Sequence, residues 1–421
     1  MESNRQRPRV LLLSQLVVYP ADNGPRAKTL QVLRRLCARY DVTFCAFARD
    51  DQEARNADAL RGICHRVETV PLRRTLPGEA RFLIESLITG DSYVLHRDER
   101  PAMREMVRRL LDEEQIDVLH VDQLNMMRYV PRDWPGTVIL DEHNAVWQVV
   151  DRLRQGTRDP LRRWMLGREV RLMRQIEGAA CEWASLVLTV SEPDRAALAA
   201  VAGATSAPVA LVPIAVDAAA CALVRAKRRP EAARLLTIAT LYWPPNSEGI
   251  AWWLREGFAS LAARCPEVVY DIAGARPPRA LRAEVARHPG ARLHGYVADA
   301  APYWMAATAL VVPLLSGGGV RVKILEAMAM GVPVISTSVG CEGLAVRDGE
   351  HLLVADTPEA IAAAGARLIG DPALAQRLAR RAYQLVCEHY DVPIALAALD
   401  AAYASVLASR GEEANACALP L

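Results

Sequence analysis

Short apolar stretches alternate with helical stretches along most of this 421-residue chain. Several of them, such as residues 10–13 and 309–312, are apolar without interruption, which is typical of strands covered on both faces. Repeated β–α alternation predicts parallel sheets flanked by helices. The expected strands are Arg9–Gln15, Asp41–Ala48, Asp117–Asp122, Thr137–His143 and Leu186–Ser191, then Arg234–Leu241, Glu267–Gly274, Arg292–Val297, Ala309–Leu314 and Pro333–Thr337.

The strand rhythm breaks once, in the Ala- and Arg-rich stretch that ends at residue 233, and a new strand follows it. We therefore predict an α/β fold of two doubly wound, Rossmann-like domains that face each other across a cleft. Ligands of such folds bind at the carboxyl ends of the strands. The expected parts are an N-terminal domain (1–217), a linker (218–233), a C-terminal domain (234–390), and a helix crossing back with a tail (391–421).

The composition indicates an ordinary soluble enzyme, with 52% apolar and 24% charged residues. A net charge of only +2 gives no reason to expect a nucleic-acid partner. The nine cysteines include no C-x-x-C pair and have mostly apolar neighbours, so we expect them to be reduced core residues of a cytoplasmic protein. The N-terminus has no long apolar region and no signal peptide is expected.

Residues 316–344 contain the clearest motif. Three glycines, Gly317–Gly319, lead into a helix whose charges, Arg321, Lys323 and Glu326, lie in its first half, while its other residues are apolar. Glycines allow close backbone approach to a ligand, and a helix N-terminus offers free N–H groups to an anion. Only three of the 51 basic residues are lysines, and a compact ammonium fits beside a phosphate. The motif predicts an anion site.

A similar junction follows the first expected strand, where Gly24, Arg26 and Lys28 precede or open a helix. Together these motifs resemble the family 4 glycosyltransferases of the GT-B fold. The matches follow the family's order over roughly residues 9–390, and comprise Tyr19–Lys28, Asp117–His120, Leu188–Asp194, Val212–Asp217, Trp243–Asn246, Ile272–Gly274, His294–Val297, Gly317–Thr337 and Gly340–Leu344.

The resemblance implies a transferase that moves a sugar from a nucleotide-sugar donor to an acceptor hydroxyl with retention. It places the nucleotide in the C-terminal domain and the acceptor on the N-terminal side, with Glu326 on the ribose. The donor diphosphate would meet the amides of Gly317, Gly318 and Gly319, the catalytic charges of Arg321 and Lys323, and the Gly24 loop. We also assign Asn246 and Glu342 to the donor. No metal-ligand cluster stands out near the motif, so transfer without metal or cofactor is expected.

Two departures from the family pattern concern the donor site. Many relatives carry a glutamate where this chain has Gly318, and that glutamate usually touches the donor hexose. The usual Arg and Lys after the first strand of the second domain are also absent from residues 239–250. Sugar selection must therefore rest on backbone N–H groups or on other side chains.

His143 follows an apolar strand at a position where relatives often carry a cleft-facing histidine, and we predict that it is catalytic. The alternative is a structural histidine with satisfied hydrogen bonds. His120, Asp122 and Arg26 are further candidates on the acceptor side.

Residues 152–174 carry eight arginines among apolar side chains. This pattern is typical of a basic amphipathic helix that lies on an anionic membrane. A solvated face of an Arg-rich protein is the alternative. Membrane contact would suit a lipid-linked acceptor, on the cytoplasmic face of the inner membrane. We expect a role in surface polysaccharide or glycolipid synthesis; the alternatives are a GT-B-type epimerase or phosphorylase, or a non-catalytic partner subunit.

Overall fold

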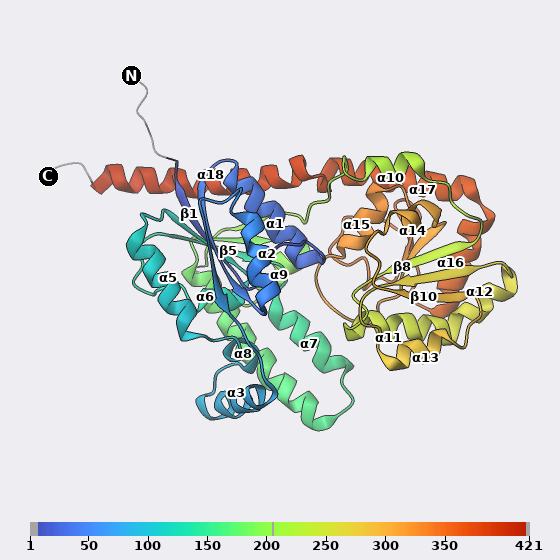
Figure 1. The fold of residues 1–421 in the computed structure, drawn as a ribbon, viewed down its shortest axis with the longest axis horizontal. Helices are drawn as coiled ribbons and strands as arrows, with labels where there is room; N and C mark the ends of the chain where they lie inside the picture. Colours follow the sequence, from blue (N-terminus) through green and yellow to red (C-terminus); the bar gives the residue numbers. More distant parts are fainter. Residues whose placement is uncertain (1–6, 204–205, 418–421) are drawn as a thin grey trace, which may run out of the picture. The chain divides into compact units, whose positions relative to one another are not determined.

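A computed structural model describes residues 7–203 and 206–417, without the side chains of Leu76 and residues 409–417 (Figure 1). The chain folds into two compact units, one formed by residues 1–213 and 396–421 and the other by residues 214–395. The predicted linker, residues 218–233, falls in the second unit and contains helix α10 (Ala222–Lys227). The chain returns to the first unit within helix α18 (Val392–Cys417).

The first unit is built on a seven-stranded sheet in the order β3-β2-β1-β4-β5-β6-β7, with all neighbours parallel. The order reverses between β1 and β4, and this switch point is where doubly wound sheets bind ligands. The strands are β1 (Arg9–Ser14), β2 (Asp41–Ala48), β3 (Arg66–Pro71), β4 (Val118–Asp122), β5 (Thr137–Glu142), β6 (Leu186–Thr189) and β7 (Val209–Leu211).

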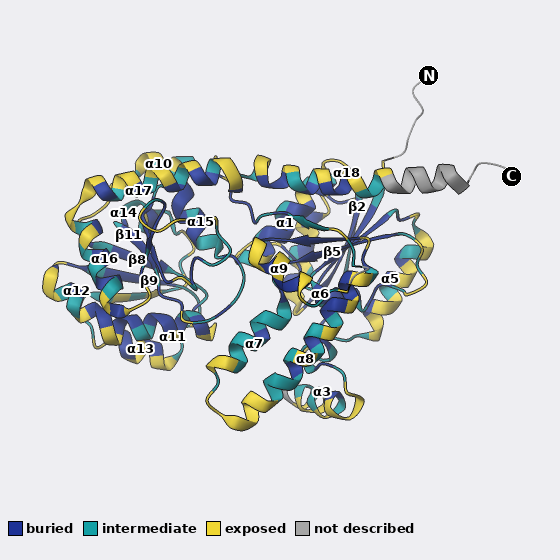
Figure 2. Cartoon of the chain, turned by 180° about the vertical axis from the view of Figure 1, so that it is seen from behind, coloured by how far each residue is buried: buried dark blue, intermediate teal, exposed yellow. Residues whose placement is uncertain are grey.

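Helices connect the parallel strands of the first unit. Every residue of β4 and β5 is buried, because helices cover both faces of the central strands (Figure 2). The helices are α1 (Gly24–Cys37), α2 (Asp51–Ala57), η1 (Asp58–Leu60), α3 (Leu76–Thr89), α4 (Tyr93–His96), α5 (Pro101–Glu113), α6 (Leu124–Met127), α7 (Val146–Gly156), α8 (Pro160–Trp183) and α9 (Glu192–Ala199).

The second unit has a six-stranded sheet in the order β10-β9-β8-β11-β12-β13, again with all neighbours parallel. Its switch point lies between β8 and β11. The strands are β8 (Arg234–Ile238), β9 (Val269–Ala273), β10 (Ala291–Gly295), β11 (Ala309–Val312), β12 (Val334–Ser336) and β13 (Leu353–Val354). The helices besides α10 are α11 (Pro244–Trp253), η2 (Leu254–Phe258), α12 (Ala259–Arg264), α13 (Arg279–Val285), α14 (Ala301–Ala306), α15 (Val322–Ala329), α16 (Pro358–Gly370), α17 (Pro372–Leu385) and η3 (Val386–Tyr390).

The predicted α/β fold with two parallel sheets is confirmed, and each of the ten expected strands is present with bounds that differ by up to three residues. Three edge or near-edge strands, β3, β7 and β13, were not predicted. The expectation of buried cysteines holds for six of the eight that the structure describes; Cys37 and Cys387 are half-buried, and the side chain of Cys417 lies outside the described residues.

The Arg-rich segment 152–174 is not one helix. It contains the end of α7, a break at residues 157–159, and the first part of α8, so it is the tip of a helical hairpin (Figure 2). Pro160 explains the break, because a proline is tolerated in the first turn of a helix but not in its interior. None of the described helices is both long and apolar enough to cross a membrane.

Candidate functional site

The glycine motif lies at the switch point of the second sheet. It connects the carboxyl end of β11 to α15, while the neighbouring strand β8 leads into α11. Helix α11 packs closely on this connection, since a Cβ at Gly249 would lie 2.0 Å from the carbonyl oxygen of Pro313. A Cβ at Gly317 would lie 3.9 Å from Cβ of Pro245. The first turn of α11 therefore borders the glycine loop.

Two of the three glycines hold backbone conformations that other residues avoid. Gly317 has φ of 120° and Gly319 has φ of 78°. Arg321 precedes α15 at the N-cap position, and its guanidinium donates to the carbonyl oxygens of Gly318 and Gly319. The loop is thus fixed by its own arginine, and the charge of Arg321 lies against the loop that it stabilises.

Lys323 and Glu326 form an ion pair on the first turn of α15, with 2.8 Å between Nζ of Lys323 and Oε2 of Glu326. The lysine side chain is 43% exposed and the glutamate 27%, so both are open to a ligand. The opposite side of this helix is buried through Ile324, Leu325 and Met328. The structure therefore presents the two predicted donor residues together at a helix N-terminus, where an anion is stabilised.

Asn246 and Glu342 lie on the two neighbouring connections. Asn246 is the third residue of α11, and its side-chain amide donates to the carbonyl of Thr240 at 3.0 Å. Glu342 is half-buried in the turn after β12. That turn is tied to the end of β11 because Thr337 Oγ1 donates to the carbonyl of Leu314 at 2.6 Å and accepts from the amide of Gly340 at 3.0 Å. The predicted donor residues of the second unit thus come from connections after three adjacent strands, β8, β11 and β12.

Asp122 is the centre of a buried polar cluster at the switch point of the first sheet. It accepts hydrogen bonds from Ser14 Oγ at 2.8 Å and Thr29 Oγ1 at 3.0 Å, and its Oδ1 lies 2.9 Å from Nε2 of His143. Burial by itself would raise the pKa of Asp122. The charge and the hydrogen bond of His143, together with the charge of Lys28, outweigh burial and lower this pKa below its usual value. His143 is 7% exposed, and the carboxylate holds its ring in place.

Lys28 and Asp141 form a second buried pair beside this cluster. Burial disfavours the carboxylate, yet the charge of Lys28 and the hydrogen bond of His120 hold the pKa of Asp141 far below its usual value. His120 is completely buried, with Nε2 3.4 Å from Asp141 and Nδ1 2.8 Å from the hydroxyl of Tyr403 on α18. His120 thus belongs to the core and does not line an open surface, in contrast to its predicted acceptor-side position.

Arg26 is also buried, in ion pairs with Asp22 at 2.9 Å and with Glu53. These pairs hold the start of α1 against the connection after β2, so the structure assigns the Arg26 side chain to packing rather than to an exposed acceptor surface. Gly24 opens α1, where Asn23 caps the helix by accepting from the amide of Arg26 at 3.1 Å.

Two family models match this chain. Residues 24–220 match the family described as Glycosyltransferase Family 4, and residues 232–371 match the family described as Glycosyl transferases group 1. This chain belongs to the family 4 glycosyltransferases. The boundary between the two matched ranges lies between β7, the last strand of the first sheet, and β8, which begins the second sheet.

Solved structures share the GT-B fold of this glycosyltransferase. Sucrose-phosphate synthase from Thermosynechococcus elongatus superposes with a TM-score of 0.70 at 19% identity, covering 96% of this chain and 100% of that one. HepE from Anabaena, solved in complex with UDP, has a TM-score of 0.65 at 14% identity, covering 94% and 100% of the two chains.

One curated relative matches part of the glycosyltransferase. An uncharacterized 44.6 kDa protein in the cps region of Klebsiella pneumoniae is 24% identical over an alignment of 164 residues that covers 37% of this chain. The match spans 42% of that relative's length.

Two buried glutamates of the glycosyltransferase were not predicted from the sequence. Glu177 on α8 accepts from the amides of Val146 at 2.6 Å and Trp147 at 2.7 Å, and so caps α7. Burial raises the pKa of Glu177 to about 7. Burial, together with the charge of Glu177, also raises the pKa of Glu142, which follows Asp141 on β5. A glutamate in the otherwise apolar stretch 176–181 was the only signal in the sequence, because the amides that Glu177 binds lie 30 and 31 residues away.

In the part of the chain that the structure describes, two groups of carboxylates and histidine have ligand atoms close enough for a metal ion, namely Asp122, Asp141 and His143, and Asp91, His96 and Glu99. Protein cations already lie within both groups. Lys28 pairs with Asp141, and Arg128 contacts Asp91 at 3.1 Å and Glu99 at 3.3 Å. These contacts supply the positive charge that the carboxylates require.

Proposed function

We propose that this glycosyltransferase transfers a hexose from a nucleoside-diphosphate sugar to an acceptor hydroxyl, with retention at the anomeric carbon and without a metal ion or cofactor. The observation that supports it most directly is the half-exposed pair of Lys323 and Glu326, 2.8 Å apart on the first turn of α15 behind a glycine loop. An ammonium matches a diphosphate, and a carboxylate accepts from the two hydroxyls of a ribose.

In the proposed reaction, negative charge develops on the departing diphosphate. The amides of Gly317–Gly319 and the ammonium of Lys323 stabilise this charge, because preorganised donors act most strongly where charge appears in the transition state. Arg321 holds the loop through the carbonyls of Gly318 and Gly319 and adds positive potential. His143, held by Asp122, orients the donor sugar or the acceptor.

A nucleotide-sugar donor is also supported by the structural neighbour HepE, which was solved with UDP and glucose. The partial match to a protein in a cps region supports a role in surface polysaccharide or glycolipid synthesis. Groups other than a glutamate at this position must select the sugar, because Gly318 replaces the glutamate that in many relatives touches the hexose.

We further propose that the glycosyltransferase works at the cytoplasmic face of the inner membrane. The tip of the α7–α8 hairpin exposes Leu161 (67%) and Trp164 (61%) beside Arg158, Arg162 and Arg163. The neighbouring α3 exposes further apolar side chains and is joined to α8 by Arg168, which donates to the carbonyl of Ser86. Exposed apolar side chains next to arginines favour an anionic lipid surface. The exposed residues of α3 are Ile84, Leu87 and Ile88.

The donor class is tested by thermal unfolding of the full chain with UDP, GDP, ADP and dTDP and with the matching sugar nucleotides. A ligand that binds only the folded state raises the midpoint temperature of unfolding, by an amount that grows with the ligand concentration. We expect one base to stabilise the protein in the absence of divalent ions and in the presence of EDTA. A shift that requires a divalent ion would contradict the metal-independent assignment, and no shift with any nucleotide would contradict the donor assignment.

Product analysis then separates transfer from the alternatives. With the stabilising nucleotide sugar and an acceptor mixture, a retaining transferase releases nucleoside diphosphate and conserves the anomeric configuration, which NMR reports. An inverted product would contradict the proposed stereochemistry. Nucleotide release in equal amounts with and without acceptor would contradict transfer itself.

A further inference from the structure

A cavity of about 510 Å³ lies in the first unit, away from the glycine motif. It is bounded by α5, by the segment from α6 to residue 133, and by the C-terminal part of α8. Four arginines from these elements line it, and neither the donor assignment nor the polar cluster around Asp122 uses them. They are Arg104, Arg108, Arg128 and Arg132.

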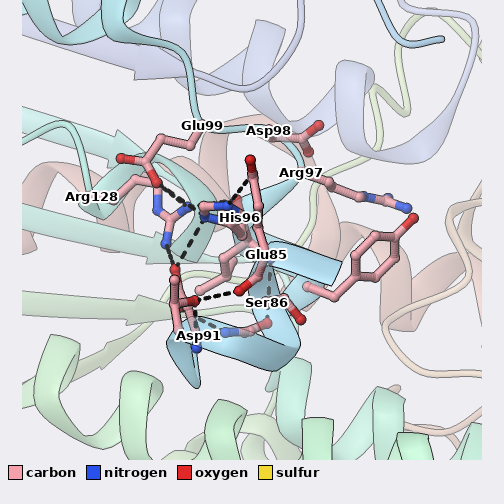
Figure 3. A network of polar contacts seen from close by, with 12 residues as sticks. Glu85, Ser86, Asp91, His96, Arg97, Asp98, Glu99 and Arg128 are labelled. Carbon is pink, nitrogen blue, oxygen red and sulfur yellow. Dashed lines mark hydrogen bonds and ion pairs between the residues drawn. The ribbon is translucent and has the colours of Figure 1, made fainter. Parts of the chain in front are cut away.

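Arg128 is held rigidly at the wall of this cavity. Figure 3 shows the guanidinium of Arg128 between Glu99 and Asp91. The same guanidinium donates to the carbonyl of Leu95 at 2.8 Å. Its Nε atom is buried and has no hydrogen-bond partner among the described residues. The contacts with Glu99, Asp91 and Leu95 fix the guanidinium, so that its positive charge stays beside the cavity.

Arg108 and Arg132 have no ion-pair partner among the side chains that the structure describes, and both are exposed. Arg132 is stacked on the ring of Trp183, with 4.3 Å between Cζ and the ring centroid, which positions its N–H groups without neutralising them. Asp133 and Asp91 also line the cavity, and Asp91 is already paired with Arg128.

The remaining wall is apolar. Leu124 and Met127 are buried at the α6 side, and α8 contributes Ile176, Ala180 and Trp183. Charged donors on one wall and an apolar surface on the other suit a ligand with an anionic head and an apolar body. Arginine binds phosphate oxygens in a bidentate way, which makes a phosphate or diphosphate the matching head.

We propose that this cavity, which we call the arginine cavity, binds an amphipathic organic phosphate, with the phosphate on Arg108, Arg128 and Arg132 and the apolar part on the side of α8. The site is distinct from the donor site on α15 and does not depend on it. A membrane-derived prenyl phosphate and a free phosphate share the head group, and the apolar wall favours the former.

Calorimetric titration of the full chain with farnesyl diphosphate, inorganic pyrophosphate and farnesol tests the proposal. We expect farnesyl diphosphate to bind at least tenfold more tightly than pyrophosphate, and farnesol not to bind. The double variant R108Q/R132Q should lose at least tenfold in affinity for farnesyl diphosphate. The matched control is R109Q, an exposed arginine on the same helix that is not part of the cavity, with an expected change below twofold.

The variant K323A separates this site from the donor site, because a diphosphate also suits the glycine motif. Farnesyl diphosphate binding that persists in K323A and is weakened in R108Q/R132Q supports the arginine cavity. Binding that is lost in K323A and unchanged in R108Q/R132Q would overturn it, as would no binding to the unmodified protein. Equal affinities for farnesyl diphosphate and pyrophosphate would overturn the role of the apolar wall. Thermal unfolding of each variant verifies that it is folded.

Discussion

Nε2 of His143 lies 2.9 Å from Oδ1 of Asp122 at the carboxyl edge of the first sheet. Asp122 is itself held by Ser14 and Thr29, so the histidine ring is oriented through β1, α1 and β4 together. A titratable ring in a fixed orientation at a switch point has the arrangement expected of a group that contacts a substrate.

Replacing His143 by alanine should lower the turnover number by about 10- to 100-fold, because a positioning contact near the reacting atoms is lost. Asp122 keeps its hydrogen bonds from Ser14 and Thr29 in this variant, and thermal unfolding verifies that the variant is folded. Steady-state kinetics with the donor found by thermal unfolding measures the effect. The control H389A changes an exposed histidine in η3 and should behave as the unmodified protein. Equal turnover in H143A and H389A would assign His143 a structural role.

The buried Lys28–Asp141 pair should stabilise the first unit. Substitution K28M leaves an uncompensated carboxylate, which costs about 3–5 kcal/mol of the free energy of unfolding. The double variant K28M/D141N removes both charges and should be more stable than K28M alone. Denaturant unfolding of the two single variants and the double variant measures the coupling. Additive losses would show that the two side chains do not interact.

Stability should depend on the protonation of Glu177, whose pKa burial raises to about 7 from an ordinary value of 4.5. The folded protein holds a proton that the unfolded chain releases near pH 4.5. The contribution of Glu177 to stability is therefore complete below that pH and is lost as the pH rises through about 7. Glu142, whose pKa is also raised, acts in the same direction.

We expect the thermal midpoint to fall between about pH 5 and about pH 8, and the fall to be smaller in E177Q, which keeps one acceptor for the amides of Val146 and Trp147. The control E105Q changes an exposed glutamate on α5 and should follow the unmodified profile. Parallel pH profiles for E177Q and the unmodified protein would contradict the assignment.

The hydroxyl of Tyr403 on α18 is 2.8 Å from Nδ1 of the buried His120. The substitution Y403F leaves that nitrogen without its partner and should cost about 1–3 kcal/mol of the free energy of unfolding. The control Y296F removes a hydroxyl from a side chain that is 71% exposed and should cost little. Equal stability of Y403F and Y296F would show that His120 does not need this bond.

Local patterns were sufficient to predict the ten main strands, because uninterrupted apolar runs such as those of β1 and β11 are a direct signature of buried parallel strands. They did not predict β7, whose three residues are only half-buried, or β13, which has two residues. Short edge strands carry too few apolar side chains to stand out.

The donor pair was predictable since Lys323 and Glu326 are three residues apart on one helix. The polar cluster of the first unit was not, because Lys28 and Asp141 are 113 residues apart and the sequence gives no sign that they meet. The position of Arg321 was not predictable either, because its contact with Gly318 depends on the positive φ angles of the loop.

The proposed function depends most on the donor site at Lys323 and Glu326, and calorimetric titration with the stabilising nucleoside diphosphate tests it directly. K323A and E326A should each weaken binding by about 10- to 100-fold, as expected when a charged hydrogen bond is removed. K227A and E359A make the same changes elsewhere in the second unit, on α10 and α16, and should bind as the unmodified protein does. If K323A and E326A also bind with unchanged affinity, the donor does not lie on α15.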